Sequence, residues 1–166
     1  MMKIKEIIEN LEKTKEFKDY KKQNEYSFLS HIFHIDDEPN KDDFQVGYYN
    51  KDDTITTFII NQDQVKIIPQ AEIFKKPDME VKKLNVDDVK ITIQQADKIA
   101  RDILKEKYKK ETASKRILIL QNIELNLVYN ITFITQKSSI INIKIDAKTG
   151  EIKHESLTPL SSLISK

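Results

Sequence analysis

The stretch that decides the fold runs from Asn126 to Glu151 and reads NLVYNITFITQKSSIINIKIDAKTGE. Its first part has a period of two, which is typical of a strand with one face in a core. A polar break follows, and the same period then returns. The stretch therefore predicts two strands that form a hairpin. The core-facing residues would be Leu127, Tyr129, Ile131 and Phe133 on the first strand and Ile141, Ile143 and Ile145 on the second.

A turn is expected directly after the second strand, at Asp146–Gly150. An Asp side chain can accept hydrogen bonds from backbone amides a few residues further on, which favours a turn. Gly150 can adopt the positive φ that other residues resist. Ile152 would then begin a short return strand.

The string IKIDAKTGEI at Ile143–Ile152, preceded by an aromatic strand and a hairpin, resembles the C-terminal half of a PepSY domain. Ile91–Ala96, which reads ITIQQA, is similar to the start of the helix in that family. The resemblance covers roughly Lys90 to His154, and Tyr129 stands where a Trp is common. It implies a small non-catalytic α+β module of a kind proposed to bind or restrain peptidases.

Composition limits the other classes of protein. A chain of 166 residues with 39% hydrophobic residues can form one domain or two small ones. The 28 Lys and Arg residues balance 27 Asp and Glu residues, which argues against nucleic acid as a partner. Without Cys there are no disulfides and no thiolate metal sites. The charged start and the lack of a long apolar stretch predict a cytoplasmic protein that does not bind membranes. A chain from which a signal peptide had been removed would have the same pattern.

The first half of the chain predicts one helix and four strands. Apolar residues from Ile4 to Leu11 recur at helical spacing, and we expect a helix over about Lys3–Lys22. Gly47, inside one of the strands, indicates a bulge or a close approach of another group. The expected strands are Tyr26–Ile35, Phe44–Tyr49, Ile55–Ile60 and Val65–Ile68.

The second half predicts a helix that begins with a capping box, because Gln95 lies three residues after Thr92. Ile117–Ile123 is apolar on both faces and is expected to be a central strand. Thr158 and Pro159 would be the first residues of a short C-terminal helix.

The predicted fold is therefore α+β, with two helices packed on antiparallel sheet. The order of a helix and then strands occurs twice, which suggests two tandem PepSY-like (cystatin-like) units. They would comprise residues 1–69 and 91–166, joined by a connection at 70–90. The alternative is that any α+β protein of this length has a similar rhythm, and the first half has no glycine that matches Gly150.

The sequence contains no set of residues that would support catalysis. With two glycines there is no phosphate-binding loop, and the G-x-S-x-G and H-E-x-x-H motifs are absent. His31 and His34 lie next to an acidic loop, but strand positions three apart point to opposite faces. The acidic loop itself lacks the spacing of a calcium loop. We therefore expect no enzyme activity, no cofactor and no bound metal.

Three functions stay open on the sequence alone. The first is a module that binds another protein, through polar residues of the hairpin and an aromatic patch. The second is a small-ligand-binding or enzymatic domain with a cavity between helix and sheet. The third is a structural subunit of a homo-oligomer. The candidate partner-binding residues are Asn130, Thr132, Asn142 and Lys144 on the hairpin and Tyr48 and Tyr49, although tyrosines on strands often simply pack.

Overall fold

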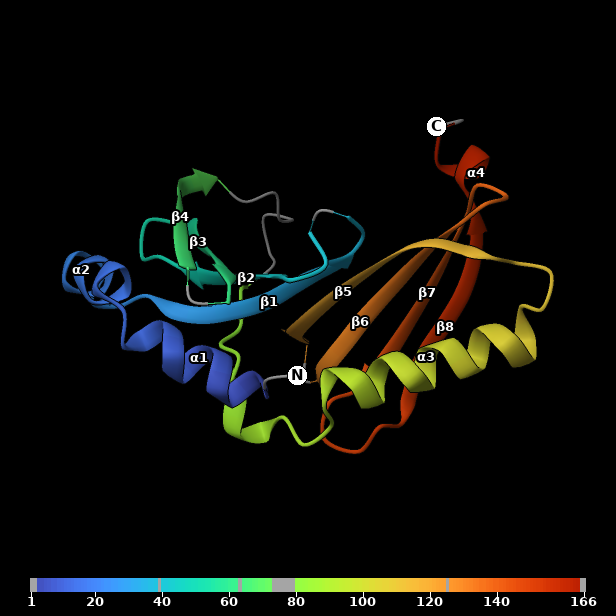
Figure 1. Ribbon diagram of the computed structural model, residues 1–166, viewed down its shortest axis with the longest axis horizontal. Coiled ribbons are helices and arrows are strands. Elements are labelled where there is room, and N and C mark those ends of the chain that lie inside the picture. Colours follow the sequence, from blue (N-terminus) through green and yellow to red (C-terminus); the bar gives the residue numbers. More distant parts are fainter. Residues whose placement is uncertain (1–2, 39, 63, 73–79, 125, 165–166) are drawn as a thin grey trace.

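The computed structural model describes residues 3–38, 40–62, 64–72, 80–124 and 126–164. They form a single eight-stranded antiparallel sheet, with α1 and α3 on one side of it and α4 at the end of β8 (Figure 1). The strands are β1 (Phe28–Asp36), β2 (Asp43–Tyr49), β3 (Thr54–Asn61), β4 (Gln64–Glu72), β5 (Ala113–Ile123), β6 (Asn126–Thr135), β7 (Ser139–Asp146) and β8 (Ile152–Pro159). The helices are α1 (Ile4–Glu12), α2 (Lys15–Gln23), the 3₁₀ turn η1 (Val86–Asp88), α3 (Ile93–Lys107) and α4 (Leu160–Ile164).

The strand order is β4-β3-β2-β1-β5-β6-β7-β8. Each half of the chain contributes a meander of four consecutive strands, and the two meanders meet where β1 pairs with β5. The predicted α+β class with antiparallel sheet is confirmed. The strand expected at Ile117–Ile123 lies in β5 and has a neighbour on each side, as a strand that is apolar on both faces requires.

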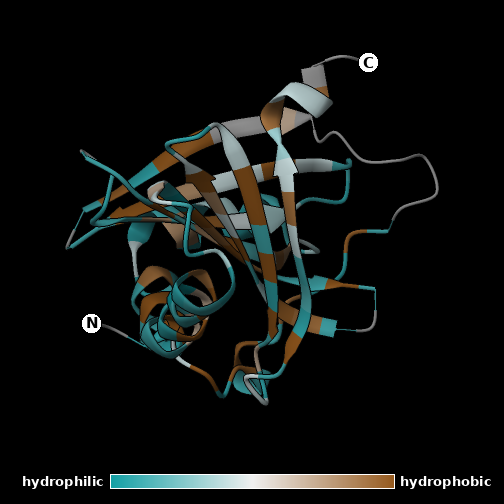
Figure 2. Cartoon of the chain, turned by 90° about the vertical axis from the view of Figure 1, so that its right-hand side faces the viewer, coloured by the Kyte–Doolittle hydropathy of each residue, from teal (hydrophilic) through white to brown (hydrophobic). Residues whose placement is uncertain are grey.

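One face of the sheet and the helices form the core. α1, α2 and α3 place buried side chains in the same cluster as alternate residues of the strands. Figure 2 shows the alternation as brown and paler bands along the strands. In the second half of the chain, the fully buried members include Tyr129, Ile131, Phe133, Ile141, Ile143 and Ile145, which the hairpin pattern predicts.

The single helix expected over Lys3–Lys22 is wrong, because the chain breaks between α1 and α2. The hydroxyl oxygen of Thr14 accepts a hydrogen bond from the amide of Phe17 at 3.2 Å and so caps a new helix. The new direction brings the Phe17 ring to 5.1 Å from Tyr48 and 5.6 Å from Phe58. Thr14, an N-cap type of residue inside the predicted helix, is the signal in the sequence for this break.

The capping box at the start of α3 is confirmed. The amide of Gln95 donates to the Thr92 hydroxyl at 3.1 Å, and the amide of Thr92 donates to the Gln95 side chain at 2.8 Å. At the other end of the chain the boundary differs, since Thr158 and Pro159 end β8 and α4 begins at Leu160. In the predicted connection, β4 extends to Glu72, and residues 73–79 lie outside the described residues.

The predicted turn after β7 is confirmed. A carboxylate oxygen of Asp146 accepts hydrogen bonds from the amides of Lys148 at 2.8 Å and Thr149 at 2.9 Å. Gly150 has a φ of 79°.

We expect Gly150→Val to lower the free energy of unfolding by about 1–3 kcal/mol, because a β-branched residue is strained at that φ. Denaturant unfolding measures the change, and an unaltered midpoint would contradict the role given to this glycine.

Candidate functional site

Alternate residues of the strands point away from the core, to a face on which α1, α2 and α3 do not pack. We call it the open face. Near its middle lie four apolar side chains, and all four are half-buried and outside the core cluster. Their strands adjoin, since Phe33 pairs with Ile119 and Ile35 with Ile117. We call these four residues the central stripe.

Next to the central stripe, the open face is polar. The pairing of β6 with β7 sets Asn130 opposite Lys144 and Thr132 opposite Asn142. The amide nitrogen of Asn142 donates to the Asn130 side-chain oxygen at 2.6 Å and contacts the Thr132 hydroxyl at 3.1 Å. The structure therefore brings together the four hairpin residues that the sequence pointed to. They extend the central stripe directly, because Asn130 pairs with Ile119 on β5.

The two tyrosines named from the sequence do not form one patch. Tyr49 is on the open face, where its ring lies 5.3 Å from Phe28. Tyr48 points to the core and is 3% exposed, so its inclusion among partner-binding residues is wrong. Successive residues of a strand face opposite sides, and Tyr48 packs among the rings of Phe17, Tyr20 and Phe58. Burial raises the pKa of its hydroxyl.

At Gly47 a side chain packs directly against the backbone of the open face. The imidazole of His31 lies directly over this glycine, because a Cβ added there would be 2.1 Å from its Cε1 atom. Nδ1 of His31 is 2.8 Å from the Ser30 hydroxyl. Burial lowers the pKa of His31, which favours the neutral ring. The sequence predicted a bulge or the close approach of another group at Gly47. The group that approaches is the imidazole ring of His31.

A group of charged residues that is not among the predicted site residues lies on the helix side of the sheet. Arg116 on β5 is 6% exposed, and its Nε is 3.0 Å from a carboxylate oxygen of Asp97 on α3, without the alignment of a hydrogen bond. Arg101 donates to Asp97 at 2.8 Å and to Asp36 on β1 at 3.0 Å. The group joins α3 to the two central strands. Burial lowers the pKa of Arg116, and the charge of Asp97 opposes that shift.

His34 completes this group and is thereby separated from His31. Its Nδ1 is 3.0 Å from the Arg116 guanidinium, which can only donate, so Nδ1 is the acceptor. Nε2 then carries the proton that is donated to the carbonyl of Lys41 at 2.7 Å. His31 lies on the open face and His34 on the helix side, as the alternation of a strand predicts. In the described part of the chain, no three His, Asp or Glu side chains are placed to share a metal ion.

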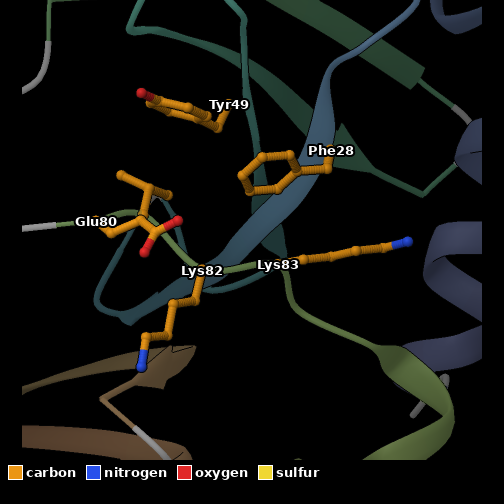
Figure 3. Close-up of a pocket in the computed structure, with 6 residues that line it drawn as sticks. Phe28, Tyr49, Glu80, Lys82 and Lys83 are labelled. Carbon is orange, nitrogen blue, oxygen red and sulfur yellow. The ribbon is translucent and has the colours of Figure 1, made fainter.

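A hollow of about 450 Å³ lies at one end of the open face, between the rings of Phe28 and Tyr49 and the segment Glu80–Lys83 (Figure 3). The amine of Lys83 points away from the two rings, and that of Lys82 bonds to the carbonyl of Glu124. A small-molecule site normally has polar groups that converge on one point. The hollow lacks that arrangement, and we treat it as part of the open face.

Comparisons with known proteins describe the fold and no more. No family model matches the chain, and no curated protein matches it. A crystal structure from Clostridium difficile 630, which bears the name "putative lipoprotein", is similar with a TM-score of 0.56 and 19% sequence identity. The match covers 86% of this chain and 90% of that one, so the two share nearly the whole fold. Among the described residues, no helix is both long and apolar enough to cross a membrane.

Proposed function

We propose that this protein is a non-catalytic module that binds another protein through its open face. The observation that carries the proposal is the central stripe, Phe33, Ile35, Ile117 and Ile119, which no described helix covers and which borders a hydrogen-bonding patch. An apolar centre beside polar groups is the usual composition of a protein interface.

The open face is large enough for such an interface. Eight strands at about 4.8 Å spacing give a width of roughly 34 Å, and strand segments of about six residues give a length of roughly 20 Å. The product, roughly 680 Å², is close to the ~800 Å² that each partner buries in an ordinary complex. The face as a whole is thus about the size of one partner's share of an ordinary interface.

The alternative of a ligand cavity between helix and sheet receives less support. Tyr129, Ile131 and Phe133 fill that interior and are each 0% exposed. The charged side chains that lie close together there, Arg116 and Asp97 among them, pair with one another and hold α3 in place. This arrangement supports a structural role for those groups and favours the binding function over catalysis.

We further propose that the chain consists of two tandem PepSY-like (cystatin-like) units. In each half, helical segments precede a four-stranded meander, and the first strands of the two meanders pair antiparallel at the centre. Such an arrangement is what two copies of one unit would form around a twofold axis. The proposal that the partner is a peptidase depends only on the resemblance to the PepSY family.

The cellular location and the oligomeric state stay predictions. We propose the cytoplasm as the location, whereas the structural neighbour bears the name "putative lipoprotein". Fractionation of the native cells with an antibody decides between the two. A homo-oligomer would form through one of the two edge strands, β4 or β8. Light scattering measures the molar mass of the protein in solution and so gives the number of subunits.

The test of the proposed function is affinity capture from the native lysate. The variant carries Asn130→Lys and Thr132→Glu on the open face. The control carries Gln94→Lys and Lys105→Gln on exposed positions of α3, and both variants leave the net charge unchanged. We expect the control to recover the same partners as the parent and the open-face variant to lose them. Equal recovery by both variants, with equal melting points, would remove the open face from the function.

A further inference from the structure

One row of cross-strand neighbours on the open face crosses the whole sheet. Each member is paired in register with the next, from the edge strand β4 to the edge strand β8. A partner chain that runs across the strands would therefore contact the side chains of this row one after another. In order, its members are Lys66, Ile59, Gln45, Phe33, Ile119, Asn130, Lys144 and His154.

The charges of this row have one sign. Its middle is apolar, with Phe33 and Ile119 of the central stripe, and a lysine lies toward each end. Within the described residues, neither Lys66 nor Lys144 has an ion-pair partner, and the row contains no carboxylate. Lys115, at the end of the same face, differs because it pairs with Asp37 at 3.1 Å.

The same is true of the row beside it. Ile35, Ile117, Thr132 and Asn142 follow one another across four strands without a charged member. The named members of the two rows thus carry two positive charges and no negative one. A carboxylate of the open face, that of Asp43 on β2, lies next to them and accepts a hydrogen bond from Asn61 at 2.6 Å. The formal net charge of the whole chain is only +1, so this excess is a local property of the row that contains Lys66 and Lys144.

We propose that the segment of the partner that contacts the open face is an extended chain with apolar side chains in its middle and carboxylates on both sides of them. This inference rests on the proposed function and specifies the chemistry of the partner. The apolar residues would cover the central stripe, and the carboxylates would pair with Lys66 and Lys144. Complementary charge at the border of an apolar contact selects the partner and its orientation.

The spacing of the two lysines sets the length of that segment. Lys66 on β4 and Lys144 on β7 are six strand spacings apart in the sheet order, which is roughly 29 Å at ~4.8 Å per spacing. An extended chain advances ~3.3 Å per residue, so about nine residues separate the two acidic positions.

The experiment uses three synthetic peptides on the full chain. Each has the same centre of alternating Val and Thr, and the ends carry paired Glu, paired Gln or paired Lys. Fluorescence anisotropy gives the affinities at low and at high salt. We expect the Glu peptide to bind about tenfold more tightly than the Lys peptide at low salt, and the difference to shrink at high salt.

Charge reversal identifies the lysines. With Lys66→Glu and Lys144→Glu together, we expect the Lys peptide to become the tighter ligand. The matched control, Lys105→Glu with Lys109→Glu, has the same change of charge away from the open face, and it should retain the preference for the Glu peptide.

Three results with the peptides would overturn the inference. They are equal affinity for the three peptides, no binding of any of them, and a preference that survives the reversal of Lys66 and Lys144. Binding to phosphatidylglycerol vesicles in place of the peptides would also overturn it, since the surface would then serve lipid. If capture from lysate depends on Asn130 and Thr132 while the peptides show no preference, the proposed function stands and this inference alone fails.

Discussion

Asp97→Ala is expected to lower the free energy of unfolding by about 3 kcal/mol, although Asp97 lies on the outer helix layer. Its carboxylate is 3.0 Å from the guanidinium of Arg116 and 2.8 Å from that of Arg101. The Arg116 side chain is only 7% exposed, so it would keep its charge in the core without the nearest carboxylate. A buried charge whose partner is removed is one of the most costly changes in a protein.

The control for this prediction lies on the same helix. Lys98 and Asp102 form an ion pair at 2.8 Å, but they are exposed, and Asp102→Ala should change stability by no more than about 0.5 kcal/mol. The double variant Asp97→Ala with Arg116→Met should recover part of the loss, because the unpaired cation is gone. Denaturant unfolding of the four proteins measures these differences. Equal losses for Asp97→Ala and Asp102→Ala would show that the buried pair contributes nothing.

The local part of the fold could be predicted because each signal lies within a few residues. The two strands of the hairpin alternate with a period of two, and the residues predicted to face the core are buried. The turn at Gly150 and the capping box at Thr92 each depend on hydrogen bonds between side chains and amides that lie two or three residues apart. Such short-range chemistry does not depend on the rest of the chain.

The pairing of β1 with β5 could not be predicted in the same way. His34 and Leu118 become neighbours across more than eighty residues, and no local pattern selects that partner. The open face depends on this pairing, because it joins Phe33 to Ile119 and makes the central stripe continuous. The four hairpin residues on that face were predictable because they lie on two consecutive strands.

For two residues that were predicted wrongly or not at all, the alternation of side chains along a strand was sufficient to predict the side on which they lie. Tyr48 and Tyr49 are successive strand residues, so both could not face a partner. Arg116 lies two residues before Leu118 and four before Leu120, so all three side chains are on the core face of the strand. A charged group in the core requires a partner there. The sequence shows that such a partner must exist, and only the structure identifies it as Asp97 on α3.

Gly47→Val is expected to lower the free energy of unfolding by about 3 kcal/mol, in a strand where valine would otherwise be preferred to glycine. The new Cβ would lie 2.1 Å from Cε1, 2.6 Å from Nε2 and 2.7 Å from Nδ1 of His31. The ring would have to move as a whole, and its Nδ1 would leave the Ser30 hydroxyl.

Removal of the ring tests the cause directly. In the His31→Ala background the space above Gly47 is free, and Gly47→Val should there be neutral or stabilise the strand by up to about 1 kcal/mol. The sign of the effect thus depends on one side chain, which a double-mutant cycle in denaturant measures. If Gly47→Val costs the same with and without the imidazole, the strain has another origin. The contact between His31 and Gly47 would then not be the reason that glycine occupies this strand.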